Sequence, residues 1–322
     1  MPGLITHYIC GDTVYRRLGG DIAAILSRHR GLYNVGCQGP DIFFYYITSV
    51  LNSSVRGIGE RMHKGGANSF VRKAAEHGRS LAKADQEALF AYLSGFLGHY
   101  ALDCAAHPYV YCRTGYVAGT SQSAIANLSR HIEFEAAIDA LLLKQRSGKF
   151  PHEFRRKRIW HMVAAKRADA APAADAVAWA VNETYGTKMS GKHWLAAMDN
   201  TVFIIKALQS KGGKRKKLLE GLERLVLRTP LISALIHPQS VSDCNEINYL
   251  NNKNGLWHNP WDENAVPRRE SFAELMEMGA AEGVALIEAL WQFMFGAGIN
   301  GVEFADRVGD KSFGSGLLYH QP

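Results

Sequence analysis

Residues 93–112, LSGFLGHYALDCAAHPYVYC, combine two histidines and an aspartate at a regular spacing. His99, Asp103 and His107 recur every fourth residue, so a helix would align them in one polar stripe. The apolar residues around them are typical of a helix that is buried on several sides. Buried ionisable groups need partners, and histidine and carboxylate are suitable zinc ligands. The alternative is a network of core hydrogen bonds, which is common for any one buried histidine.

The spacing limits how a metal ion could use this stripe. At about 1.5 Å rise per residue, His99 and His107 are separated by roughly 12 Å along the helix axis. Because zinc sits only about 2.1 Å from a ligating nitrogen, one ion can hardly accept both histidines. The carboxylate of Asp103 could instead contact two ions, which in multi-metal sites lie about 3.5 to 4 Å apart. The stripe therefore needs further ligands from elsewhere in the chain.

Three candidate ligands precede the stripe. His7 lies among apolar residues, and Asp41 begins an aromatic segment, where it is either a helix cap or a half-buried carboxylate that needs a cation. His63 lies in residues 52–68, which are rich in Asn, Ser, Gly and Arg and are predicted to form a loop. A histidine in such a loop is normally exposed, so His63 is a candidate ligand only if other ligand-type side chains lie near it.

Two more candidates follow the stripe. His131 and Glu135 are again four residues apart, on a helix predicted over residues 120–146, where a surface pair is the ordinary explanation. Taken together, the ligand-type side chains exceed what core networks usually need, and they predict a composite metal site. The candidate ligands are His7, Asp41, His63, His99, Asp103, His107, His131 and Glu135.

Helical periodicity dominates the chain, and no strand, internal repeat, P-loop or dinucleotide motif is convincing. Pro108 is expected to end the helix that carries the stripe. The sequence predicts an all-α, multi-helix bundle formed as one domain over residues 1–322. The metal-site motifs fall in residues 1–145, and helices between residues 150 and 296 complete the bundle. Residues 297–322 are Gly-rich and weakly patterned.

The composition is that of a globular protein with an excess of positive charge. The 322 residues are 47% hydrophobic and 21% charged, with a formal net charge of +7. This charge favours anionic partners such as phosphate esters, lipid headgroups or nucleic acid, without choosing among them. Two basic clusters, residues 155–158 and Lys211 with residues 214–217, could provide peripheral membrane contact. Such runs are more often solvated helix ends or loops.

The cysteines and the N-terminus bear on cellular location. The five cysteines are an odd number with no CxxC pair, which argues against a disulfide framework and a cysteine zinc finger. The N-terminal residues lack the features of a secretory signal, so a reduced cytoplasmic location is expected. No apolar run is long enough to span a bilayer as a helix.

Five segments together resemble the zinc-dependent phospholipase C family. They are GLITHYICGD, NVGCQGPDIFFYY, the pair Met62 and His63, GFLGHYALDCAAHPYVY, and RHIEFE. That family shares an all-helical fold and a trinuclear zinc centre with single-strand-specific zinc nucleases. Its well-studied secreted members also use an N-terminal Trp that this chain lacks, and they have a longer gap where Asp103 and His107 stand here.

The resemblance implies zinc as the cofactor, with two or three ions. One zinc would be held by Asp41, His63, His99 and Asp103. A second would share Asp103 and add His7. A third would be held by His107, His131 and Glu135, in agreement with the spacing argument that His107 serves a different ion from His99.

The chemistry that the resemblance implies is hydrolysis of a phosphodiester in a phospholipid or a related substrate. Zinc lowers the pKa of a bound water from about 15.7 toward 7, so that hydroxide can attack phosphorus. Asp103 would lie beside the attacking oxygen, and Asp41 would orient the water or accept a proton, so both are predicted to be catalytic. The aromatic run Phe43–Tyr46 could line the site as an apolar or cation-binding wall, although aromatic residues at helical spacing are more often core.

Two other functions remain as alternatives. A single-strand nuclease of the related zinc family would use aromatic platforms and a basic groove, and only this alternative makes nucleic acid a partner. A noncatalytic, metal-stabilised helical protein would bind a membrane or a partner through its basic clusters. Zinc binding without hydrolysis would favour the last, and cutting of single-stranded DNA or RNA would favour the nuclease.

Overall fold

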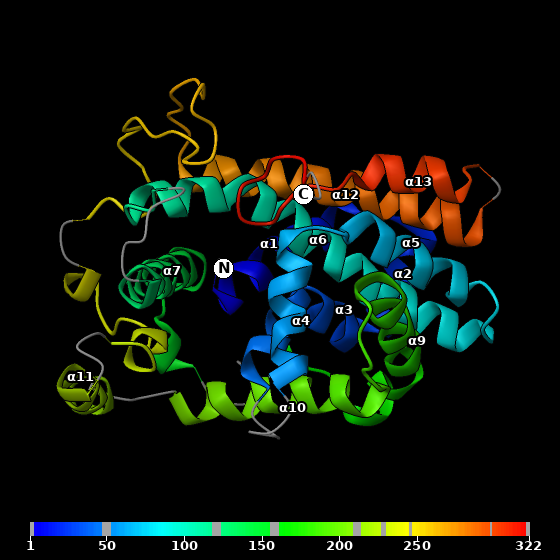
Figure 1. The fold of residues 1–322 in the computed structure, drawn as a ribbon, viewed down its shortest axis with the longest axis horizontal. Helices are drawn as coiled ribbons and strands as arrows, with labels where there is room; N and C mark the ends of the chain where they lie inside the picture. Colours follow the sequence, from blue (N-terminus) through cyan, green and yellow to red (C-terminus); the bar gives the residue numbers. More distant parts are fainter. Residues whose placement is uncertain are drawn as a thin grey trace.

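The structure is a computed structural model that describes residues 3–46, 53–117, 124–154, 161–208, 214–226, 230–244, 247–296 and 298–319. Regular structure in these residues is helical, and the only β-pairings among them are two isolated bridges, Trp257 with Arg268 and Lys311 with Leu318 (Figure 1). The predicted all-α bundle is therefore confirmed. The organisation as one domain stays a prediction, because several connections between helices fall outside the described ranges.

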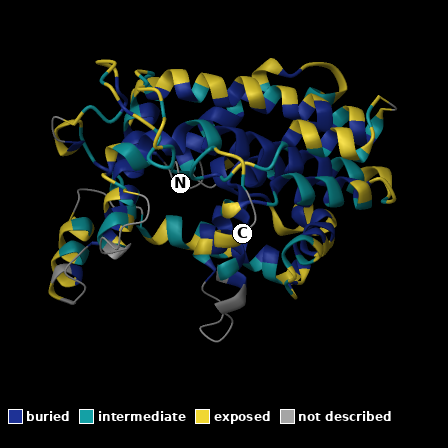
Figure 2. Ribbon diagram, turned by 45° about the horizontal axis from the view of Figure 1, so that its top comes forward, coloured by how far each residue is buried: buried dark blue, intermediate teal, exposed yellow. Residues whose placement is uncertain are grey.

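Helix α6 (Lys83–Arg113) runs through the centre of the molecule. Its 31 residues include Phe90, Phe96 and Tyr109, which are fully buried, and Figure 2 shows the interior helices as mostly buried. A helix that is apolar on all sides is stable only when other helices cover it. Those in contact with it include α1 (Leu4–Arg17), α3 (Arg30–Gly36), α5 (Ala67–Gly78), α7 (Ala124–Ser147), α9 (Arg167–Tyr185) and α12 (Phe272–Phe295).

Glycines bring α3 and α6 into backbone contact. A Cβ atom on Gly36 would lie 2.1 Å from the carbonyl oxygen of Tyr92, and one on Gly95 would lie 2.1 Å from that of Tyr33. No other residue type fits at either position without moving a helix. This close packing fixes α3, and the segment that follows it, against the part of α6 that carries the polar stripe.

The predicted end of this helix at Pro108 is wrong. α6 continues through Pro108 to Arg113, so His107 lies inside a continuous helix. Pro108 has no N–H to donate to the carbonyl of Cys104, and this costs the helix one hydrogen bond. Ala106, Tyr109 and Val110 are fully buried around it, and their packing outweighs the local preference.

The predicted loop at residues 52–68 is also wrong. Most of this stretch is helix α4 (Ser53–Lys64), which places His63 in a last helical turn. Val55, Ile58 and Met62 are at most 3% exposed and recur at helical spacing. This buried apolar face outweighs the helix-weakening glycines between them. α4 packs against the 3₁₀ helix η1 (Gly39–Tyr45).

The remaining described helices complete the bundle around this centre. None of the helices in the described part of the chain is both long and apolar enough to cross a bilayer. The cytoplasmic location stays a prediction. Residues 155–158 of the first basic cluster, and Lys211 of the second, lie outside the described residues. The further helices are α2 (Gly20–Arg28), α10 (Gly191–Leu208), α11 (Lys214–Val226), α13 (Gly301–Val308), η2 (Pro151–Glu153), η3 (Ser233–Leu235) and η4 (Ser242–Cys244).

Candidate metal centre

The structure brings all eight candidate ligands together in the interior. Seven are at most 6% exposed, and the side chain of His63 is 15% exposed. They form two neighbouring sets. The Asp103 cluster consists of His7 on α1, Asp41 on η1, His63 on α4, and His99 and Asp103 on α6, whereas the Glu135 group consists of His107 on α6 with His131 and Glu135 on α7.

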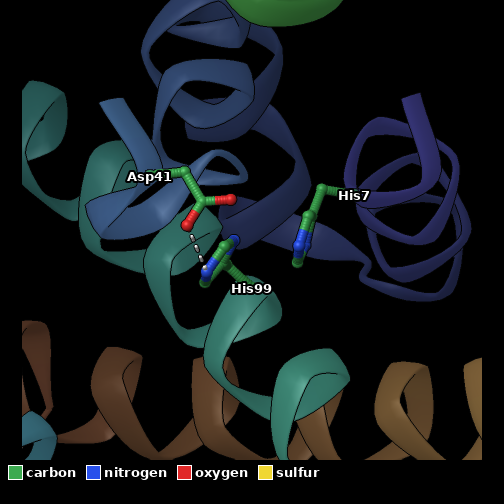
Figure 3. A group of neighbouring side chains, drawn as sticks. All are labelled: His7, Asp41 and His99. Carbon is green, nitrogen blue, oxygen red and sulfur yellow. Dashed lines mark ion pairs between the residues drawn. The ribbon is translucent and has the colours of Figure 1, made fainter. Parts of the chain in front are cut away.

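Asp103 lies at the middle of its cluster. Its Oδ1 is 3.2 Å from Nε2 of His7, and its Oδ2 is 3.1 Å from Nε2 of His99 and 3.9 Å from Nε2 of His63. Asp41 approaches from the other side, with Oδ1 3.0 Å from Nε2 of His63 and 3.8 Å from Nε2 of His99. Figure 3 shows His7, Asp41 and His99 converging from three different elements. One carboxylate therefore lies within reach of three imidazoles.

The Glu135 group forms where α7 meets the next turn of α6, which carries His107. Oε1 of Glu135 is 2.7 Å from Nε2 of His131 and 3.5 Å from Nε2 of His107. The other ring nitrogen of His107, Nδ1, is 3.6 Å from Oδ2 of Asp103. His107 thus lies between the two sets, and its Nε2 belongs to a different group from His99, as the spacing along the helix requires.

Backbone carbonyls determine the tautomer of three of the histidines. A carbonyl only accepts hydrogen bonds, so the ring nitrogen bonded to it carries the hydrogen. In the neutral ring the other nitrogen then presents a lone pair, which is the form that binds a metal. These bonds run from Nδ1 of His63 to Gly59 (2.7 Å), from Nδ1 of His99 to Cys37 (3.1 Å), and from Nδ1 of His107 to Phe313 (2.9 Å).

The atoms that face one another across the Asp103 cluster lack hydrogen-bond partners among the described residues. Its nitrogens and oxygens come within ion-pair distance without the geometry of a hydrogen bond. Uncompensated burial of such groups is costly, and a cation between them would remove the cost. The atoms are both ring nitrogens of His7, Nε2 of His63 and His99, Oδ1 of Asp41 and both carboxylate oxygens of Asp103; Nε2 of His107 shares this property.

The donor set fits zinc in kind and in spacing. Three sets of ligand atoms, each within 4.8 Å of one another, occur among the described residues. Imidazole nitrogen and carboxylate oxygen are both common zinc ligands. The sets are His7 with Asp41 and His99, His63 with His99 and Asp103, and His107 with His131 and Glu135.

The surroundings of Asp103 and His107 favour the protonation states that metal binding needs, whereas the carboxylates of Asp103 and Asp41 outweigh the burial of His99 and raise its pKa. Burial alone would raise the pKa of Asp103, but His107, His99 and His7 outweigh it and hold that pKa well below its usual range. Burial lowers the pKa of His107 to about 4. At neutral pH the carboxylate is therefore ionised and the imidazole is neutral, as in metal ligands.

Gly39 allows the chain to pass directly over His99. Its φ is +52°, in the left-handed region, and a Cβ atom there would lie 2.4 Å from Cδ2 of the His99 ring. Any other residue would clash with the imidazole and would also strain the backbone. Asp41 follows two residues later, so this turn places the aspartate against the histidine.

Phe313 is a site residue that the sequence did not predict. Its ring is fully buried, with its centroid 5.1 Å from that of His63 and 5.8 Å from that of His99. Its N–H donates to the carbonyl of His63 at 3.0 Å, and its own carbonyl accepts the hydrogen bond from His107. The C-terminal segment thus connects the two sets. An isolated aromatic residue in a glycine-rich stretch is the local signal that could have identified it.

The aromatic run after Asp41 has a mixed role. Phe43 and Tyr46 are buried, whereas Phe44 is 38% exposed and its ring centroid lies 5.2 Å from that of His63. The predicted aromatic wall is therefore mainly core. Phe44 is the member of the run that reaches both the site and the surface.

The fold and the geometry define a class: an all-helical protein with buried histidine and carboxylate groups that can hold several metal ions. The pattern of the family described as zinc dependent phospholipase C matches residues 6–211. The chain therefore belongs to the zinc-dependent phospholipase C family. All eight candidate ligands lie in the matched range, whereas α11 and Phe313 lie beyond it. No curated protein matches the chain. No solved structure matches it.

Proposed function

We propose that the protein is a zinc-dependent hydrolase of phospholipase C type that cleaves a phosphodiester in a phospholipid or a similar substrate. The observation that carries this proposal is Asp103, a fully buried carboxylate whose two oxygens lie 3.2 and 3.1 Å from the imidazoles of His7 and His99 without hydrogen bonds to either. Such an arrangement suits a carboxylate that is shared between two cations.

We assign the ligands in three sets. Asp41, His63, His99 and Asp103 would hold one ion, and Asp103 with His7 would hold a second. The third set is His107 with His131 and Glu135. When bound, zinc supplies Lewis acidity that activates water and neutralises charge on the phosphoryl group.

The protein side chains prepare the site for this chemistry. The hydrogen bonds of His63, His99 and His107 to backbone carbonyls orient the rings before any ligand binds, so little reorganisation is needed. Burial acts to raise the pKa of Asp41, but His99 and His63 outweigh it and lower the pKa. Ionised Asp41 would accept a hydrogen bond from the attacking water and orient it, although its low basicity makes it a weak proton acceptor.

The exposed edge of the site indicates where a substrate approaches. His63 is the most exposed of the eight candidate ligands, and the ring of Phe44, next to it, is more exposed still. We expect the phosphodiester to reach the cluster across this edge, with an apolar part of the substrate against Phe44. This fits an amphiphilic substrate better than a fully polar one.

The decisive experiment compares the wild-type protein with Asp103→Ala. Zinc per chain is measured by elemental analysis, and hydrolysis of a soluble chromogenic phosphodiester and of phosphatidylcholine vesicles is followed in the same samples. We expect two or three zinc ions in the wild-type protein, and loss of zinc with a fall in rate of about 10²- to 10³-fold or more in the variant. Asp21→Ala, at an exposed position on α2, is the matched control.

Three outcomes would contradict the proposal. Absence of zinc from the wild-type protein after reconstitution would indicate that these histidines belong to a core hydrogen-bond network and do not bind metal. Bound zinc with no hydrolysis of any phosphodiester would indicate a noncatalytic, metal-stabilised protein. Cleavage of single-stranded DNA or RNA without turnover of lipid would identify a nuclease.

A further inference from the structure

Helix α11 (Lys214–Val226) lies at the periphery of the molecule, at the lower left in Figure 1. One side of it is attached to the segment around η3. The buried carboxylate of Glu223 accepts hydrogen bonds from the N–H groups of Ile232 (2.5 Å) and Ser233 (3.1 Å), and Nζ of Lys216 donates to the carbonyl of Ile236 at 3.0 Å. Residues seven apart share a helix face, so positions 216 and 223 define the side that faces the protein.

Three leucines project from the other side. Leu218, Leu222 and Leu225 are 66%, 53% and 83% exposed. Their spacing of four and three residues aligns them in one stripe along the helix. A lone exposed leucine needs no explanation, but an unpartnered stripe of them on one helix marks an interaction surface.

Among the side chains of α11 that the structure describes, the exposed charged ones are positive. Lys214, Arg215 and Lys217 are exposed at the N-terminal end of α11. The first turn contains no acidic residue, although the helix dipole favours negative charge there. These cations therefore do not stabilise the helix itself. Glu220 and Glu223 lie on the side away from the stripe, and Glu223 is already hydrogen bonded.

We infer that α11 docks the protein onto an anionic phospholipid surface. The leucine stripe would enter the boundary between headgroups and acyl chains, and the exposed cations would contact anionic headgroups. A nucleic acid would match the cations but not the leucines, and an apolar protein partner would match the leucines but not the cations. The inference rests on the proposed function, since a lipid hydrolase must meet its substrate at a surface.

The test measures partition of the zinc-loaded protein onto vesicles by flotation. Vesicles of phosphatidylcholine alone are compared with vesicles that also contain phosphatidylserine. One variant carries Leu222→Glu with Leu225→Glu, and a second carries Lys214→Glu with Lys217→Glu. Val302→Glu on α13, at a 69% exposed position, and Lys83→Glu, at the exposed start of α6, are the matched controls.

We expect the wild-type protein to bind the phosphatidylserine vesicles more tightly than the others, and less tightly at high salt. Partition should fall at least roughly fivefold for each lysine replaced, because loss of one cation near an anionic surface costs about 1 kcal/mol and the added glutamate is also repelled. The vesicle partition of the leucine variant should fall by at least the same factor. Both controls should bind like the wild-type protein, and all variants should hydrolyse the soluble chromogenic phosphodiester at the wild-type rate.

Equal partition of the wild-type protein and both α11 variants, including no partition by any of them, would overturn the inference. So would a dimer in gel filtration that the leucine variant abolishes, since the stripe would then bind a second copy, or binding of single-stranded RNA in place of vesicles. Hydrolysis of the soluble substrate separates this result from the proposed function. Vesicle binding without hydrolysis would contradict only the proposed hydrolase function. Hydrolysis without vesicle binding would contradict only the proposal that α11 docks onto membranes.

Discussion

The carboxylate of Asp139, on α7, holds the first turn of α1 through Thr6. Its Oδ1 accepts hydrogen bonds from the Thr6 N–H at 2.8 Å and from the Thr6 hydroxyl at 2.6 Å. Its Oδ2 accepts one from the Ile5 N–H at 3.1 Å and lies 3.0 Å from Nε2 of His237. A buried carboxylate at a helix N-terminus satisfies N–H groups that the helix leaves unpaired and complements its dipole.

Because His7 directly follows Thr6, we expect Asp139→Asn to disturb the metal centre from outside it. The amide cannot accept all of these bonds, so the free energy of unfolding should fall by about 1–3 kcal/mol. The zinc proposed next to His7 should be lost more readily than the others. Denaturant unfolding and zinc titration measure the two effects, with Asp306→Asn, at an exposed position on α13, as the control. Unchanged zinc binding would show that α1 is positioned by other contacts.

Gly39→Ala should damage the Asp103 cluster through the ring of His99. The added methyl group would lie 2.4 Å from that ring, at a backbone φ of +52° that alanine rarely adopts. We expect a loss of about 1–3 kcal/mol in stability from the backbone strain, together with weaker zinc binding. Gly57→Ala on α4 is the control, since nothing lies within 4 Å of its added Cβ. A variant that binds zinc like the wild-type protein would contradict this account of the turn.

Phe313→Ala should loosen the C-terminal segment that connects the two sets of ligands. Removal of a fully buried phenylalanine ring typically costs about 3–5 kcal/mol, because a cavity is left behind. Phe203→Ala, at a 61% exposed position on α10, should change stability by less than about 0.5 kcal/mol. Thermal unfolding compares the two variants, and zinc content shows whether His63 and His107 remain in place. Equal melting temperatures would rule out a structural role for Phe313.

The zinc-free protein should lose stability as the pH falls from about 6.5 to about 4. Burial lowers the pKa of His107 to about 4, whereas a histidine in the unfolded chain titrates near 6.5. Between these values the unfolded state binds more protons, so the free energy of unfolding falls with decreasing pH. Burial lowers the pKa of His7 and His131 as well, and these act in the same direction.

His99 opposes this trend, because the carboxylates of Asp103 and Asp41 outweigh its burial and raise its pKa. Burial also raises the pKa of Glu135, which opposes the trend, and lowers the pKa of His29, which adds to it. Four lowered histidines against His99 and Glu135 leave a net loss of stability in acid. Urea unfolding at several pH values after chelation measures the slope, and His107→Gln should reduce it. A slope that is the same in the variant would show that His107 does not titrate in this window.

The candidate ligands could be recognised in the sequence because local spacing carries the information. His99, Asp103 and His107 interrupt an apolar segment every fourth residue, so a helix must place them on one face whatever surrounds it. Their separation along the axis also predicts that His99 and His107 belong to different groups. Their role as metal ligands stays a proposal.

The parts that were missed depend on contacts between distant segments. Pro108 and the glycines of α4 oppose helix locally, and only the burial of their neighbours decides that both segments are helical. Phe313 and Asp139 lie more than 130 residues from some of their partners, His107 and Thr6, so no local pattern pairs them. The sequence by itself determined which side chains can do chemistry. Tertiary structure decided how they are held, because packing energy gathered over many contacts exceeds the small preferences of each residue.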